Sequence, residues 1–190
     1  MTPRTSTSLL LFPGAGSSAD HSSLHAIEAA VAPMRCVRAD FPYRKAGRKA
    51  PDRAPVLLQA VRDEAAAIGT GALVMGGRSM GGRICSLVVG DADDPLPAEA
   101  LVLISYPLHP PGKPDTLRVE HFPRLHVPCL FVSGTKDTFG TTDELTHWTA
   151  TIPGSVTHHW VQGKGHDLKG ADAEIARVVA DWIGGLSRAR

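Results

Sequence analysis

Length, composition and charge limit what this protein can be. The chain has 190 residues, which suits one domain with one hydrophobic core, so we expect a single domain over residues 1–190. Its 20 basic and 19 acidic residues nearly cancel, which argues against nucleic acid or an anionic membrane as the main partner. No apolar run is long enough to span a bilayer, and the run at residues 9–12 is too short for a signal peptide, so we expect a cytoplasmic protein. Three widely spaced cysteines in apolar runs indicate reduced core residues, with no disulfide framework or metal site: Cys36, Cys85 and Cys129.

Strand-like apolar runs alternate with helix-like amphipathic runs along the chain. In chain order we expect a strand at 8–12, a helix at 22–32, a strand at 34–39, a helix at 52–68, a strand at 72–75, a helix at 83–89, strands at 101–104 and 127–132, a helix at 141–148, a strand at 157–161 and a helix at 172–183. Several strands are apolar without alternation, which is typical of a parallel sheet covered on both faces. The sequence therefore predicts an α/β fold of about six mostly parallel strands with helices on both faces.

The third expected strand runs into a Gly-x-Ser-x-Gly sequence centred on Ser79, between Gly77 and Gly81. Strand, tight turn and helix form the context of a nucleophile elbow, in which a sharp turn lifts the serine Oγ above the sheet. We expect the serine to be strained, and the two glycines to be needed because larger neighbours would crowd each other. The alternative is an ordinary strand-to-helix turn with an N-capping serine.

Two further side chains follow later strands. Asp137 comes after the fifth expected strand and His166 after the sixth. Because the carboxyl ends of parallel strands meet at one edge of a sheet, we expect both residues to lie near Ser79. Histidine can take the proton of a serine hydroxyl, and a carboxylate can orient the imidazole. The order Ser, Asp, His along the chain is that of α/β-hydrolases. Asp137 could instead be a turn residue, with Asp167 as the rival acid.

The loop after the first strand, Gly14-Ala15-Gly16, is the expected source of a backbone donor. The N–H groups of Ala15 and Met80 are predicted to form an oxyanion hole for negative charge on the substrate. Possible substrate contacts are Arg78, Tyr43, Tyr106 and His109. Arg78 and the basic stretch 44–49 would favour an acidic substrate, although such residues more often form a solvated face or a structural ion pair.

The link between the fourth and fifth strands, residues 105–126, is the longest irregular segment. It is interrupted by five prolines, which remove backbone donors and block helix continuation: Pro107, Pro110, Pro111, Pro114 and Pro123. We therefore expect no multi-helix cap here and an open site with no lid domain. The part at 106–109 is expected to lie along the rim near Ser79.

Several motifs together resemble a known family. They are Phe12-Pro13-Gly14-Ala15-Gly16, Asp40-Phe41-Pro42-Tyr43, Gly77-Arg78-Ser79-Met80-Gly81-Gly82, Ser105-Tyr106-Pro107-Leu108-His109-Pro110, Gly134-Thr135-Lys136-Asp137 and Gly165-His166-Asp167-Leu168. With them, the chain resembles small α/β-hydrolases of the dienelactone-hydrolase-like kind. More narrowly, it resembles the group that includes the testis-expressed protein 30 type and the hydrolase-like subunit of a chromatin acetyltransferase complex. The resemblance implies a compact α/β-hydrolase fold, and the group also includes scaffold members. Such proteins usually carry His-Gly where this chain has Pro13-Gly14, which removes a side chain that orders the loop.

The sequence thus predicts a serine hydrolase that cleaves a carboxylic ester or related acyl bond of a small molecule through an acyl-enzyme intermediate. No cofactor or metal is expected. A non-catalytic scaffold is one alternative. A Rossmann-type dinucleotide-binding protein is another, because residues 14–19 match Gly-x-Gly-x-x-Ala and Asp40 ends the next strand, near the distance expected of a ribose-binding acid. The second alternative leaves Ser79 and His166 unexplained.

Overall fold

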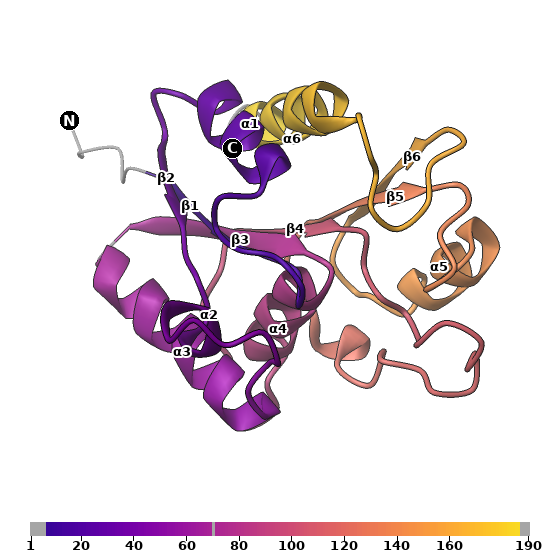
Figure 1. Ribbon diagram of the computed structural model, residues 1–190, viewed down its shortest axis with the longest axis horizontal. Helices are drawn as coiled ribbons and strands as arrows, with labels where there is room; N and C mark the ends of the chain where they lie inside the picture. The colour runs from indigo at the N-terminus through magenta and orange to yellow at the C-terminus, as the bar shows by residue number, and fades with distance from the viewer. Residues whose placement is uncertain (1–6, 70, 187–190) are drawn as a thin grey trace.

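The computed structural model describes residues 7–69 and 71–186, and its centre is a six-stranded sheet (Figure 1). The strand order is β2-β1-β3-β4-β5-β6, and every neighbouring pair is parallel. The strands are β1 (Thr7–Phe12), β2 (Arg35–Arg38), β3 (Ala72–Arg78), β4 (Ala100–Ile104), β5 (Cys129–Gly134) and β6 (Val156–Val161). The predicted parallel sheet is therefore confirmed.

Helices cover both faces of the sheet, which forms the middle of three layers (Figure 1). One face carries α1 (Ser22–Ala30) and α6 (Asp172–Leu186), which pack against each other. The other face carries α3 (Ala54–Ile68), α4 (Met80–Val89) and α5 (Thr142–Thr149). The short helix α2 (Pro42–Lys45) lies beside α3.

The strands lack polar alternation because both of their faces are buried. Along β1, Leu10 and Phe12 join the core under α3 and α4, whereas Leu9 and Leu11 join the core under α1 and α6. The same division runs along β4, where all five residues are fully buried. Burial of these side chains on both faces contributes about 25 cal/mol for each Å² of apolar surface removed from water.

Most element boundaries agree with the sequence to within three residues. The helix expected at 52–68 begins at Ala54, because Pro55 sits in the first turn, where its missing N–H costs nothing. Residues 42–45, which lie outside the expected helices and strands, form α2, again with a proline in the first turn. A capping box begins α5: Thr141 Oγ1 accepts from the Glu144 N–H, and the Glu144 carboxylate accepts from the Thr141 N–H.

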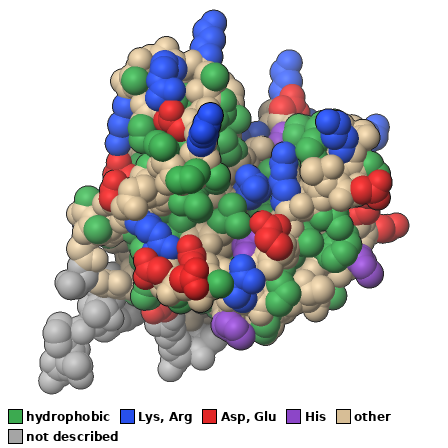
Figure 2. Space-filling view, turned by 90° about the horizontal axis from the view of Figure 1, so that it is seen from below, with side chains coloured by type: hydrophobic (Ala, Val, Ile, Leu, Met, Phe, Trp, Pro, Cys, Tyr) green, Lys and Arg blue, Asp and Glu red, His purple; other side chains and the backbone are tan. Residues whose placement is uncertain are grey.

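The link between β4 and β5 carries no helical lid. Over residues 105–128 the structure has one 3₁₀ turn, η1 (Phe122–Arg124), and is otherwise irregular. Within the described ranges, none of the helices is long and apolar enough to cross a membrane. Basic and acidic side chains are interspersed with hydrophobic ones on the face seen from below (Figure 2).

The cysteines are free thiols. Cys85 and Cys129 are buried and Cys36 is half-buried. Burial raises the pKa of the Cys36 and Cys129 thiols to about 12. These thiols are therefore protonated at neutral pH and behave as core residues.

Candidate active site

Ser79 lies at the sharp turn between β3 and α4. Its backbone has φ 46° and ψ −114°, a conformation that non-glycine residues rarely adopt. The turn is held because the Ser79 N–H donates to the Ile104 carbonyl at 2.8 Å, and the Ser79 carbonyl accepts from the Arg83 N–H at 3.0 Å. The strained serine expected from the sequence is present.

Gly77 and Gly81 are required by the neighbouring strand. A Cβ atom on Gly77 would lie 2.0 Å from the Phe12 carbonyl oxygen, and one on Gly81 would lie 2.3 Å from the same oxygen. We expected these two neighbours to crowd each other. The obstacle closest to both in the structure is the carboxyl end of β1.

His166 and Asp137 lie beside Ser79 at the carboxyl edge of the sheet. His166 Nε2 lies 2.9 Å from Ser79 Oγ, and His166 Nδ1 lies 2.9 Å from Asp137 Oδ2 and 3.0 Å from Oδ1. Asp137 is buried, and its carboxylate also accepts from the Phe139 N–H at 2.8 Å. The Phe139 ring stacks on the imidazole with its centroid 3.9 Å away. These contacts orient the imidazole toward the serine.

The rival acid Asp167 does not contact the His166 ring. Its carboxylate accepts from the Lys169 N–H, and its backbone carbonyl accepts from Arg78 Nη2 at 2.7 Å. Of the two acids that the sequence left open, Asp137 is the one that pairs with His166.

A cavity of about 470 Å³ opens beside Ser79. It is lined by the loop after β1, by the start of α4, by parts of the link between β4 and β5, and by the loops after β5 and β6, of which the last carries His166 and is called the histidine loop below. Its residues are Gly14, Ala15, Gly16, Ser17, His21, Arg78, Ser79, Met80, Arg83, Pro107, Arg118, Phe139 and His166. The nucleophile candidate and its histidine therefore face an open space large enough for a small molecule.

Ala15 and Met80 both line this cavity. Met80 is the first residue of α4, where helix geometry leaves the N–H without an intrahelical acceptor. The Ala15 N–H donates no hydrogen bond to the residues that the structure describes. The loop is close to the serine, because a Cβ on Gly14 would lie 3.5 Å from Ser79 Cβ. Both amides are thus available as donors at the cavity.

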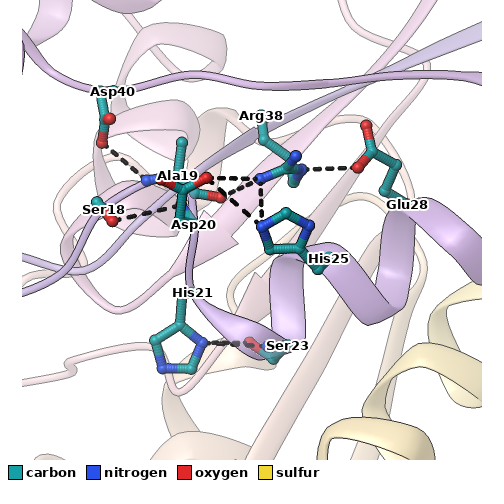
Figure 3. Close-up of polar contacts among 9 residues, drawn as sticks. All are labelled: Ser18, Ala19, Asp20, His21, Ser23, His25, Glu28, Arg38 and Asp40. Carbon is teal, nitrogen blue, oxygen red and sulfur yellow. Dashed lines mark hydrogen bonds and ion pairs between the residues drawn. The ribbon is translucent and has the colours of Figure 1, made fainter.

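The first loop is ordered although it has Pro13 where the resemblance leads us to expect a histidine. Tyr43 donates its hydroxyl to the Ala15 carbonyl at 2.7 Å, and the Ala19 N–H donates to Asp40 Oδ1 at 2.8 Å. Arg38 donates to the Ala19 carbonyl at 2.6 Å and forms an ion pair with Glu28 (Figure 3). The dinucleotide-binding alternative assigned Asp40 to a ribose and residues 14–19 to a phosphate. In the structure, Asp40 instead holds this loop through the Ala19 N–H.

Three of the expected contact residues do not line the cavity. Tyr43 is fully buried and holds the first loop. Tyr106 is buried in an aromatic cluster with Phe122 and Phe131, and its hydroxyl donates to the Arg118 carbonyl at 2.6 Å. His109 is buried, with Nδ1 2.9 Å from the Pro110 carbonyl and Nε2 3.6 Å from Glu144. The expectation that a tyrosine ring and an imidazole from 106–109 form the rim was wrong, and Pro107 lies there instead.

Arg78 does line the cavity, but its guanidinium is committed to the fold. It is buried and donates to the Asp167 carbonyl and to Ser23 Oγ. Burial lowers the pKa of Arg78 from its ordinary value, and the nearby carboxylates of Asp172 and Asp167 oppose this shift. Arg78 thus ties the elbow to α1 and to the histidine loop.

Sequence reasoning missed two other arginines at the cavity. Arg83 stands four residues after Ser79, so helical periodicity alone places it one turn further along the same face of α4. Arg118 comes from the irregular link, and no local pattern in the sequence indicates where it lies.

A family model described as an alpha/beta hydrolase domain matches residues 5–178 of the chain. The chain belongs to this family. Among solved structures it is similar to an alpha-beta serine hydrolase homologue from Coxiella burnetii, with a TM-score of 0.75, 14% identity, and 95% of this chain and 86% of that chain covered. It is also similar to Est1E from Butyrivibrio proteoclasticus, with a TM-score of 0.75, 14% identity and coverage of 98% and 90%.

A monoacylglycerol lipase from Paleococcus ferrophilus is similar in the same way. The TM-score is 0.73 at 13% identity, with 94% of each chain covered. At these identities the structural matches show a shared α/β-hydrolase fold. Together with the family match they place the protein among hydrolases by fold.

Proposed function

We propose that the protein is a serine hydrolase that cleaves a carboxylic ester or a related acyl bond of a small molecule. The observation that carries this proposal is the continuous contact from Ser79 Oγ to His166 Nε2 and from His166 Nδ1 to Asp137. A serine hydroxyl is a weak nucleophile until a base accepts its proton, and this geometry supplies such a base.

In the proposed first half-reaction, Ser79 Oγ attacks the carbonyl carbon while its proton moves to His166 Nε2. Asp137 stabilises the resulting imidazolium through Nδ1–H. Negative charge develops on the carbonyl oxygen, where the Ala15 and Met80 N–H groups would donate to it. The C–O bond to the alcohol then breaks, and the alcohol leaves with the proton from His166. An acyl group remains on Ser79.

In the second half-reaction, water takes the place of the alcohol. His166 accepts a proton from the water as its oxygen attacks the acyl carbon, and then returns the proton to Ser79 Oγ as the acid leaves. The site thereby returns to its starting state, with the elements of one water molecule added to the ester.

Within the family, we propose that the chain belongs to the narrower group of the testis-expressed protein 30 type and the hydrolase-like subunit of a chromatin acetyltransferase complex. The Tyr-Pro-Leu-His-Pro sequence at 106–110 supports this proposal. In this chain the motif anchors the link between β4 and β5 to the loop that carries Asp137. The His109 N–H donates to the Phe139 carbonyl at 3.0 Å. Gly140 leaves room for Leu108, since a Cβ on Gly140 would lie 2.8 Å from Leu108 Cβ.

Labelling with a fluorophosphonate probe tests the proposal. Wild-type protein should react covalently at Ser79, and Ser79→Ala should not react while keeping its circular dichroism spectrum. Ser17→Ala is a matched control, because Ser17 lines the same cavity and should leave labelling unchanged. If wild-type protein fails to react, the chain is a scaffold with a hydrolase fold. If Ser79→Ala is still labelled, the nucleophile is a different residue.

A further inference from the structure

Two arginines line the cavity besides Arg78. Arg83 belongs to α4, and its backbone N–H donates to the Ser79 carbonyl, so it lies one helical turn, about 5.4 Å of axis, beyond the serine. Arg118 comes from the link between β4 and β5. Both arginines therefore border the space in which a substrate of Ser79 would lie.

Neither guanidinium is paired with a carboxylate of the described residues. Arg83 Nε is buried and has no hydrogen-bond partner. The guanidinium of Arg118 donates only to the Pro107 carbonyl, at a long 3.4 Å. Burial, followed by the neighbouring Arg83, lowers the pKa of Arg118 from its ordinary value. Two like charges are thus held near each other, partly out of water, without a carboxylate partner among the described residues, which is an unfavourable arrangement.

Two other half-buried arginines are paired with carboxylates, whereas the half-buried Arg44 has no ion pair among the described residues. Arg38 contacts Glu28 and Asp20, and Arg62 contacts Asp91 and Asp94. Arg78 has no ion pair among the described residues but donates to the Asp167 carbonyl and to Ser23. Arg83 and Arg118 thus differ from Arg38, Arg62 and Arg78, which hold the fold together, and they differ from Arg44 because they line the cavity.

The backbone fixes Arg118 in position. Its carbonyl accepts the Tyr106 hydroxyl at 2.6 Å, and its N–H donates to the Leu108 carbonyl at 3.0 Å. Because Tyr106 and Leu108 are buried, the return part of the link is anchored to the core at this point. The side chain therefore extends toward the cavity from a rigid base, as a binding group must to avoid losing much conformational entropy on binding.

Resting on the proposed hydrolase activity, we propose that Arg83 and Arg118 together bind an anionic group of the substrate, a carboxylate or a phosphate, a few bonds from the ester that Ser79 attacks. Both groups match the guanidinium, whose N–H donors form paired hydrogen bonds to two oxygens. A bound anion supplies the counter-charge that the fold lacks at this place. The substrate class is therefore a small acidic ester, and neutral esters of the same size are poorer ligands.

Binding to the Ser79→Ala variant tests this proposal without requiring turnover. Isothermal titration calorimetry would compare monomethyl glutarate with neutral dimethyl glutarate, and 2-acetoxyethyl phosphate with its neutral dimethyl phosphate ester. At least one charged ester should bind 10-fold or more tightly than its neutral partner, and the pair that shows the difference identifies carboxylate or phosphate. Equal affinity within both pairs would overturn the proposal.

Charge-removing variants locate the site. In the Ser79→Ala background, Arg118→Gln and Arg83→Gln should each weaken binding of the charged ester by about 10- to 100-fold and leave the neutral ester unchanged. Lys113→Gln is the matched control, because it removes one positive charge from an exposed position of the same link. An equal loss in the Lys113→Gln variant would show general electrostatic attraction and contradict a specific site. If one arginine variant fails to fold, the other variant still tests whether the charged ester binds at this site.

The two proposals fail in different ways. If Ser79 is not labelled but the charged ester binds through Arg83 and Arg118, the hydrolase proposal is wrong and the anion site remains. If Ser79 is labelled and charge on the ester makes no difference to binding, the hydrolase proposal remains and the anion site is wrong.

Discussion

The two walls of the cavity differ in how their charges are compensated. One, the loop wall, consists of residues 14–17 and His21, and its loop is held by groups that are matched within the chain, such as Arg38 with Glu28 and Asp40 with the Ala19 N–H. The other, the link wall, consists of Arg83, Pro107 and Arg118, and its two guanidinium groups have no carboxylate partner among the described residues. An arginine holds the first wall and two arginines belong to the second, so residue type alone does not separate them.

This difference separates charged residues that hold the fold together from charged residues that are available to bind a ligand. An unpaired, partly buried charge raises the free energy of the folded state, whereas a paired one recovers much of that cost. In the proposed mechanism, the loop wall holds backbone donors in place for chemistry on any ester. In the proposed anion site, the link wall discriminates between charged and neutral esters. The following predictions separate these two roles, from the largest expected effect to the smallest.

Replacing Gly77 should damage both walls at once. In Gly77→Ala, the new Cβ would lie 2.0 Å from the Phe12 carbonyl oxygen, and the residue would hold φ 151°. The end of β1, where the loop wall begins, would have to move, and we expect a loss of about 3 kcal/mol in the free energy of unfolding. Urea denaturation measures it. Gly184→Ala, a helical site with no atom within 4 Å, should instead be neutral or gain up to about 1 kcal/mol.

Acid should lower the stability of the packing beneath the link between β4 and β5. His121 is fully buried beneath the link, with Nε2 2.8 Å from Ser86 Oγ, and burial, then Arg83 and Arg124, lower its pKa to about 3. Above about pH 6.5 the ring is neutral in both the folded and unfolded states. Below that pH the unfolded chain takes up a proton that the folded chain refuses, so stability falls as pH decreases, by up to about 2 kcal/mol between pH 6.5 and 5.

Denaturation curves measured across this pH range check the prediction. His121→Gln, which cannot titrate, should flatten the acid slope, even if the variant is less stable at neutral pH. His147→Gln, at an exposed position, should leave the slope as in the wild type. An unchanged slope in His121→Gln would show that other groups cause the acid sensitivity.

Removing the Tyr43 hydroxyl should affect the loop wall alone. Tyr43→Phe loses the hydrogen bond to the Ala15 carbonyl, which we expect to loosen the backbone donors at Ala15. We predict a fall of about 5-fold in kcat/KM that is the same for charged and neutral esters, since the hydrogen bond is worth about 1 kcal/mol. Steady-state rates on the glutarate ester pair measure it. A loss confined to the charged ester would place Tyr43 in recognition instead.

Removing the Tyr106 hydroxyl should affect the link wall alone. Tyr106→Phe loses the hydrogen bond to the Arg118 carbonyl but keeps the aromatic packing with Phe122 and Phe131. We expect about a 3-fold decrease in kcat/KM for the charged ester and no change for the neutral one, because Arg118 alone is less well placed. Equal losses on both esters would contradict the separation of the two walls.

Much of the fold follows from local patterns in the sequence. The unalternated run at residues 9–12 predicts a strand buried on both faces, and β1 has one set of side chains in each core. The Thr141–Glu144 capping box and the proline in the first turn of α3 act over three or four residues, so their effect is readable without a partner. The positions of Ser79, Asp137 and His166 after their strands also predict that the three side chains meet, because parallel strands end at one edge.

Tertiary structure decided what lies around those three side chains. The sequence placed Tyr43 and Tyr106 at the substrate and missed Arg83 and Arg118, although Tyr106 and Arg118 are joined by a hydrogen bond across twelve residues. No periodicity governs the irregular link, so the direction of each of its side chains depends on distant contacts, such as that of the His109 N–H with the Phe139 carbonyl. The need for Gly77 likewise comes from Phe12, a residue 65 positions away that only the folded sheet brings within 2.0 Å of where a Cβ would lie.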